Sequence, residues 1–170
     1  YLRRVPARGR TVVRPIADYF FPLDKIHDWN RLYGRGGFHQ FQCVVPLAAR
    51  PALRDMLQRI GTAALASPLA VLKRLGPGTG HPMSFPIEGY TLAVDLPNRA
   101  GADRLLAALN AATAEAGGRV YLAKDSSLTS AQAHAMYPGR AAWAESVNAR
   151  DPERGYETAL VKRLRLRDAA

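Results

Sequence analysis

Apolar and polar residues alternate along three stretches of the chain, which is the pattern of a β-strand with one buried face. These stretches are residues 38–46, 68–76 and 89–97. A loop with the sequence GPGTGHP separates the second stretch from the third. A shorter apolar run, RVYLA at 119–123, predicts a fourth strand.

Two stretches carry apolar residues at helical spacing, one from Pro51 onward and one over 102–116. The second is predicted to end at Gly117 and Gly118, because glycine readily adopts the left-handed conformation that closes a helix. Shorter helices are predicted over four further ranges: 23–32, 130–136, 139–149 and 154–166.

The predicted order of the central elements is strand, helix, strand, strand, helix, strand. This order is typical of the ferredoxin-like βαββαβ fold, an α+β arrangement with two helices on one face of an antiparallel sheet. The other face is then available for a ligand or another domain, and a helical C-terminal segment follows. Five polar side chains fall at strand positions that share this second face: Gln40, Gln42, Lys73, Thr91 and Asp95.

The chain has 170 residues and a formal net charge of +10, with much of the basic charge near its two ends. Such charge suits an anionic partner, either a nucleic acid, a phosphorylated ligand or a membrane surface, but it also suits solvated tails. RNA-binding sheets of this fold stack bases on exposed aromatic residues. The predicted open face carries none, so we expect no nucleic-acid partner.

Several site types lack support in the sequence. The only cysteine, Cys43, excludes an intramolecular disulfide and is predicted to lie in the core. The histidines lack metal-ligand spacing, so we expect no metal site. GPGTG lacks the phosphate-loop pattern and predicts a hairpin loop.

The ends of the chain predict its location only broadly. We recognise no signal peptide and no transmembrane segment, and we expect a cytoplasmic protein or one associated with the membrane at the cell envelope. The chain begins at Tyr1 instead of methionine, which suggests a fragment, a processed product or a trimmed chain.

Lys124 lies at the end of the apolar run RVYLA and is followed at once by Asp125. Its aliphatic side chain could lie over apolar surface with the ammonium group in solvent, or the ammonium group could pair with Asp125. Together with Lys73 and the glutamines of residues 38–46, it could instead form a polar pocket on the sheet. A lysine held there can stabilise negative charge that develops on a cofactor or substrate.

Six blocks of the sequence resemble, in the same order, the C-terminal half of one group of flavoenzymes. They are DYFFPLDKIHDWNRLYG, FHQFQCVVP, VLKRLG, SFPIEGYTLAVDLPN, GGRVYLAKDSSLT and MYP. The group is the decaprenylphosphoryl-β-D-ribose 2′-oxidase-like enzymes, which are FAD-linked oxidoreductases of the vanillyl-alcohol-oxidase type. The likeness runs from about Asp18 to about Leu166, and the C-terminal domain of sugar-lactone oxidases is similar more loosely.

Residues 1–17 are predicted from their charge to form a basic tail. The resemblance implies a substrate (cap) domain over 18–120 and a segment over 121–170 that belongs to the FAD-binding domain. It implies a bacterial enzyme that oxidises a polyprenyl-phosphate sugar, a precursor of cell-wall arabinan, by hydride transfer to FAD. A reductase partner for the keto product is a further implication. The chain lacks a counterpart of the N-terminal FAD-binding half. We therefore expect it to need that half, from the same or a separate chain, to hold FAD, and to be inactive alone.

The resemblance also implies site residues. Lys124 matches a lysine that contacts both flavin and substrate, which makes it the implied catalytic residue. Tyr121 matches a pocket tyrosine and is the second implied cofactor-binding residue as well as a substrate-binding one. The other implied substrate-binding residues are Gln40, Gln42, Lys73 and Tyr19.

One position departs from some members of the group, and two alternative functions stay open. Ala93 stands where those members carry a cysteine, so thiol-directed chemistry is not expected here. One alternative is a fragment of a sugar-lactone oxidase of the arabinono-1,4-lactone type. The other is a non-enzymatic, basic ferredoxin-like binding module.

Overall fold

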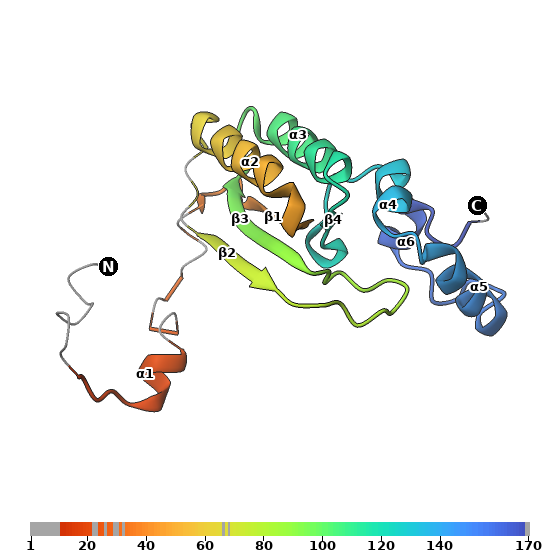
Figure 1. Cartoon of the computed structure of the whole chain (residues 1–170), viewed down its shortest axis with the longest axis horizontal. Helices are drawn as coiled ribbons and strands as arrows, with labels where there is room; N and C mark the ends of the chain where they lie inside the picture. Colours follow the sequence, from red (N-terminus) through yellow and green to blue (C-terminus); the bar gives the residue numbers. More distant parts are fainter. Residues whose placement is uncertain are drawn as a thin grey trace.

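Four strands form one sheet in the order β2-β3-β1-β4, and every neighbouring pair is antiparallel (Figure 1). They are β1 (Phe38–Pro46), β2 (Ala70–Leu75), β3 (Gly89–Pro97) and β4 (Arg119–Val120). The structure is a computed structural model and describes residues 11–21, 24, 25, 27, 28, 31, 33–65, 67 and 69–168. The predicted α+β fold is confirmed.

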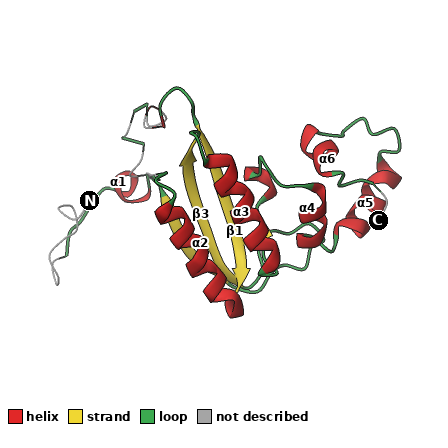
Figure 2. Cartoon of the chain, turned by 90° about the horizontal axis from the view of Figure 1, so that it is seen from above, coloured by secondary structure: helices red, strands yellow, loops and turns green. Residues whose placement is uncertain are grey.

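Helices α2 (Arg50–Thr62) and α3 (Ala102–Glu115) lie side by side over one face of the sheet (Figure 2). The remaining helices are α1 (Ile16–Phe20), α4 (Ser130–Met136), α5 (Arg140–Arg150) and α6 (Ala159–Leu164), with 3₁₀ turns η3 (Leu47–Ala49) and η4 (Leu122–Lys124). None of the helices in the described residues is long and apolar enough to cross a membrane.

Alternate residues of β1 and β3 face α2 and α3 and are buried. They are Phe41, Cys43, Val45, Leu92, Val94 and Leu96. These side chains form one core with Met56 of α2 and Leu109 of α3. Burial raises the pKa of the Cys43 thiol to about 11, as fits the core position predicted for it.

The opposite phase of the same strands places polar residues on the uncovered face. Gln40 lies opposite Asp95 across the β1–β3 ladder, and Lys73 lies opposite Thr91 across the β2–β3 ladder. The loop GPGTGHP joins the antiparallel strands β2 and β3, so the hairpin prediction is confirmed.

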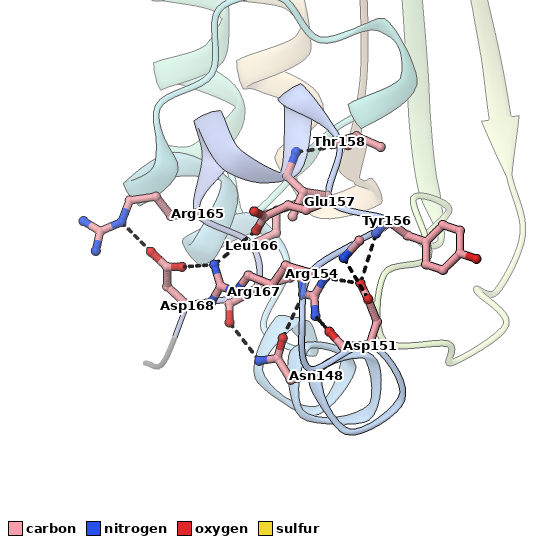
Figure 3. A network of polar contacts seen from close by, with 12 residues as sticks. Asn148, Asp151, Arg154, Tyr156, Glu157, Thr158, Arg165, Leu166, Arg167 and Asp168 are labelled. Atoms are coloured by element: carbon pink, nitrogen blue, oxygen red, sulfur yellow. Dashed lines mark hydrogen bonds and ion pairs between the residues drawn. The ribbon is translucent and has the colours of Figure 1, made fainter.

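Helices α4 to α6 extend from the sheet at the β4 edge, and a buried arginine holds the chain's last turn against α5 (Figure 3). The Arg167 side chain is 2% exposed; its Nε donates to Asn148 Oδ1 at 2.8 Å and its Nη1 to Asp151 Oδ2 at 2.7 Å. Asp151 also accepts from the backbone of Gly155 at 2.9 Å and Tyr156 at 3.2 Å.

The fourth strand is shorter than the predicted 119–123. Only Arg119 and Val120 pair in the ladder, and the Tyr121 amide donates a last bond to Gln42 O at 2.8 Å. The chain then turns, because the Lys124 amide donates to Tyr121 O at 2.9 Å. Lys124 therefore lies on the 3₁₀ turn η4 and not in a strand.

Two predicted helices also need correction. The last helix begins at Ala159 and not near residue 154, because Asp151 holds the preceding residues in a loop and Thr158 caps the helix by accepting from the Val161 amide. Of the helix predicted over 23–32, residues 24, 25, 27 and 28 lie in turns and residue 31 lies in a 3₁₀ helix. The positions 23, 26, 29, 30 and 32 lie outside the described residues.

Candidate functional site

The uncovered face of the sheet carries a hollow of about 150 Å³, which we call the sheet hollow. β1, β2, β3 and the turn η4 each contribute side chains to it. Its polar lining residues are Gln40, Gln42, Lys73, Thr91, Asp95 and Lys124. The five polar residues predicted to share this face are thus brought together, and Lys124 joins them from η4.

Asp95 is the buried acid of the sheet hollow, with 3% of its surface exposed. Its Oδ1 accepts from Gln40 Nε2 at 2.9 Å, and its Oδ2 accepts from the Tyr33 hydroxyl at 2.5 Å. Burial and this hydrogen bond raise the pKa of Tyr33 to about 12, so the phenol remains a protonated donor at neutral pH.

Gln42 occupies the next position on the same face of β1. Its Nε2 donates to Thr91 Oγ1 at 3.3 Å, and Thr91 itself is buried. Gln42 lies opposite Ala93, whose small side chain also lines the hollow. Facing residues of β1 and β3 therefore line the hollow side by side.

Lys73 and Lys124 supply the positive charge of the sheet hollow. Within the described part of the chain, neither ammonium group forms a hydrogen bond or an ion pair. Asp125 does not pair with Lys124: it forms an ion pair with Arg163 and accepts from the amides of Ser127 and Leu128 at 2.9 and 2.8 Å. Both lysines are thus available to an anionic or carbonyl-bearing ligand.

Tyr121 and Tyr19, also predicted for the site, do not line the sheet hollow. The Tyr121 ring lies against Phe85, with 4.8 Å between ring centroids. Tyr19 lies on α1, is 70% exposed and contacts Phe20 edge to face. Their roles toward substrate or cofactor stay predictions.

Tyr33 was not singled out from the sequence. It lies in no strand or regular helix whose period would reveal its direction, and it reaches Asp95 across 62 positions of sequence. Asp95 was placed on the open face, but its part in holding Gln40 depends on strand register, which the sequence does not specify. Among the described residues, no group of three potential metal ligands is found.

No family model matches the chain. Over 157 residues, or 92% of its length, the chain is 38% identical to decaprenylphosphoryl-beta-D-ribose oxidase of Mycolicibacterium smegmatis. The predicted resemblance to this type of oxidase is confirmed.

A second relative is an uncharacterized protein in the mprA 5′ region of Streptomyces coelicolor, 35% identical over 166 residues, or 96% of this chain. Both relatives are much longer. The chain spans 34% of the decaprenylphosphoryl-beta-D-ribose oxidase and 44% of the Streptomyces protein.

Proposed function

We propose that this chain is the substrate domain and C-terminal part of an FAD-dependent oxidoreductase that oxidises a secondary alcohol of a sugar. The substrate proposed is a polyprenyl-phosphate pentose, oxidised at C2, and the keto product would pass to a separate reductase. The observation that carries the proposal is the sheet hollow, which two lysines line together with two glutamines, and neither lysine has a carboxylate partner among the described residues. The 38% identity to an oxidase named for decaprenylphosphoryl ribose supports the substrate class.

The donor set of the sheet hollow fits a flavin. A lysine ammonium is the kind of group that stabilises an electron-rich ring edge as negative charge develops on it. FAD, when bound, would supply the hydride acceptor. Lys124 would contact its pyrimidine edge and the substrate, while Lys73 and the glutamines would orient the sugar or its phosphate. Tyr121 and Tyr19 are proposed as further pocket residues.

The size of the hollow supports a site in which this chain binds only part of the substrate and another part of the enzyme binds the rest. Pockets for small ligands are commonly roughly 300–1,000 Å³, and about 150 Å³ is room for only the sugar end of a lipid-linked substrate. The rest of the substrate and most of FAD would then be held by an N-terminal FAD-binding half, in the same or a separate chain. This part of the proposal places residues 18–120 in a substrate domain and 121–170 in the FAD domain.

The test is Lys124→Met in the intact enzyme, which combines this chain with its N-terminal FAD-binding half in one polypeptide or two and is loaded with FAD. We expect kcat for a prenylphosphoryl pentose to fall by about 100-fold or more, as when a group that stabilises developing charge is removed. Lys162→Met is the matched control, because Lys162 lies exposed on α6 away from the hollow. Unchanged turnover in Lys124→Met would remove this residue from the mechanism.

The same loaded protein separates the alternatives. Oxidation of a sugar lactone in place of the lipid-linked pentose would indicate that the chain is part of a sugar-lactone oxidase. Failure to oxidise either substrate, together with tight and salt-sensitive binding of RNA by the 170-residue chain, would favour the basic binding module.

A further inference from the structure

The amide of Gln40 can take only one orientation in the sheet hollow. Its Nε2 lies 2.9 Å from Asp95 Oδ1, and the other Asp95 oxygen accepts from Tyr33. A carboxylate accepts hydrogen bonds and has no proton to donate. The amide NH₂ of Gln40 must therefore face Asp95, and the carbonyl Oε1 must face the other way.

This orientation leaves Gln40 Oε1 as the atom that a ligand meets. It receives no hydrogen bond from the described part of the chain, and it is not enclosed. The one buried polar side-chain atom without a hydrogen-bond partner among the described residues is His39 Nε2. Since Gln40 lines the sheet hollow, its free acceptor is open to whatever occupies that space.

Gln42 is not fixed in the same way. Its partner is the Thr91 hydroxyl, at 3.3 Å. A hydroxyl both donates and accepts, so either orientation of the Gln42 amide is satisfied. Of the two glutamines, only Gln40 has the orientation of its amide fixed by a charged neighbour.

We propose that Asp95 is a specificity-determining residue that acts through Gln40, fixing it as an acceptor so that the sheet hollow selects a ligand hydroxyl donating at this point. Lys73 and Lys124 carry only donors, so the hollow offers donors and one fixed acceptor together. That combination matches a sugar with one hydroxyl turned to Gln40 and oxygen atoms turned to the lysines. The inference rests on the proposed function and names the group that the site recognises, a donating hydroxyl of the sugar.

A structural role for Asp95 alone would look different. Asp95 also anchors Tyr33, which stacks on Phe38 with 3.9 Å between ring centroids, and so it ties the segment before β1 to β3. A purely structural role would make Asp95→Asn lower stability or affinity for every ligand alike. A role through Gln40 changes the preference between two ligands that differ in one donor.

The experiment uses the intact enzyme with its FAD reduced under anaerobic conditions, together with a short-chain prenylphosphoryl ribose. Each sugar hydroxyl is replaced in turn by fluorine, which is of similar size but cannot donate. Dissociation constants are measured by calorimetry, and the reduced flavin cannot accept a hydride, so no turnover occurs. We expect one hydroxyl whose replacement weakens binding by roughly 5- to 10-fold in the wild type, the effect of one neutral hydrogen bond.

In Asp95→Asn the preference for the hydroxyl over fluorine should fall to about 2-fold or less. An asparagine amide can offer either a donor or an acceptor, so the Gln40 amide can then take either orientation. Tyr33→Phe removes the other hydrogen bond of Asp95 but leaves the carboxylate facing Gln40, so it should keep the wild-type preference. Asp55→Asn makes the same change of charge on the exposed face of α2 and should also keep it.

Gln40→Met provides a second route if Asp95→Asn does not fold. It removes the acceptor at similar length and should abolish the preference for the same hydroxyl. An unchanged preference in either variant overturns the inference, and so does equal loss of preference in Tyr33→Phe. If no prenylphosphoryl ribose binds even to the wild type, the proposed function itself fails, which is a distinct result.

Discussion

At the scale of single residues, the sheet hollow separates two kinds of charge. Asp95 is buried and has both oxygens engaged, whereas Lys73 and Lys124 have no carboxylate partner in the described part of the chain. The acid therefore acts on protein groups, and the lysines are left for the ligand. Asp125, which follows Lys124 directly, is paired with Arg163 and therefore does not neutralise Lys124.

Lys73 should contribute to substrate binding more than to the chemical step. It lies on β2, the strand farthest from β4 in the order of the sheet. Lys124 lies on η4, which follows β4 in the chain. Lys73→Met should raise KM for the prenylphosphoryl pentose by about 10-fold with a smaller change in kcat, as for a contact made equally in ground and transition states. Steady-state kinetics on the FAD-loaded intact enzyme measures both values.

The neighbouring residue supplies the control for Lys73. Arg74→Met removes a cation from the same strand, but Arg74 points to the other face and lies 3.9 Å from Glu88. It should leave KM within about 2-fold of the wild type, as expected for an exposed surface charge. A larger effect of Arg74→Met than of Lys73→Met would contradict the placement of substrate in the sheet hollow.

At the scale of secondary-structure elements, the close pairing of β1 with β3 depends on a glycine at the start of β3. A Cβ added at Gly89 would lie 2.0 Å from the Val45 carbonyl oxygen. Gly89→Ala should therefore lower the free energy of unfolding by about 1–3 kcal/mol or more, the cost of forcing extra volume into a packed site. Denaturant unfolding of the 170-residue chain measures the loss.

Gly76 lies at the other end of the same loop and gives a matched control. A Cβ there meets nothing within 4 Å, so Gly76→Ala should change the free energy of unfolding by less than about 0.5 kcal/mol. Equal losses in the two variants would show that the loop, and not the β1–β3 contact, sets the sensitivity.

The C-terminal elements should be sensitive to acid through Asp151. Hydrogen bonds from Arg167 hold the pKa of Asp151 below its ordinary value of 3.8. A carboxyl whose pKa is lowered in the folded state stabilises it above the unfolded pKa, and this stabilisation is lost as pH falls through the folded pKa. Unfolding free energy should therefore decline as the pH is lowered below about 4.

Arg167→Met tests this link. It should lower stability at neutral pH and make the decline below about pH 4 shallower, because Asp151 then loses its strongest partner. Arg165→Met is the control: Arg165 is exposed and contacts Asp168 instead, so the loss at neutral pH should be smaller. The two variants are compared by denaturant unfolding across a range of pH, and identical profiles would contradict the role of Arg167.

The elements also show what sequence periodicity can and cannot predict. The ranges 38–46 and 89–97 were predicted to the residue because each strand has one buried and one polar face, so alternation marks its full length. RVYLA is apolar without alternation, and its strand was predicted three residues too long. The start of α6 was missed because the residues before it are ordered by Asp151, a contact between side chain and backbone that leaves no period.

The same distinction, between residues marked by strand alternation and residues placed by contacts without a sequence period, applies to the candidate site. Strand phase alone placed Gln40, Gln42 and Lys73 on one face, and the structure brings them into one hollow. Lys124 reached it only because the chain turns after β4, which the sequence did not predict. Tyr33 acts through a contact between distant segments, and no local pattern marks such a contact.

At the scale of the whole molecule, α2 and α3 close one face of the sheet and leave the hollow on the other face shallow for a cofactor-sized ligand. The chain spans 34% of the length of its oxidase relative. We therefore expect the purified 170-residue chain to retain no flavin, whereas the intact enzyme, with its FAD-binding half supplied, should retain about one FAD per copy of this chain. Visible absorbance after desalting measures both. Stoichiometric flavin in the 170-residue chain would contradict the proposed division between a substrate domain and a separate FAD-binding half.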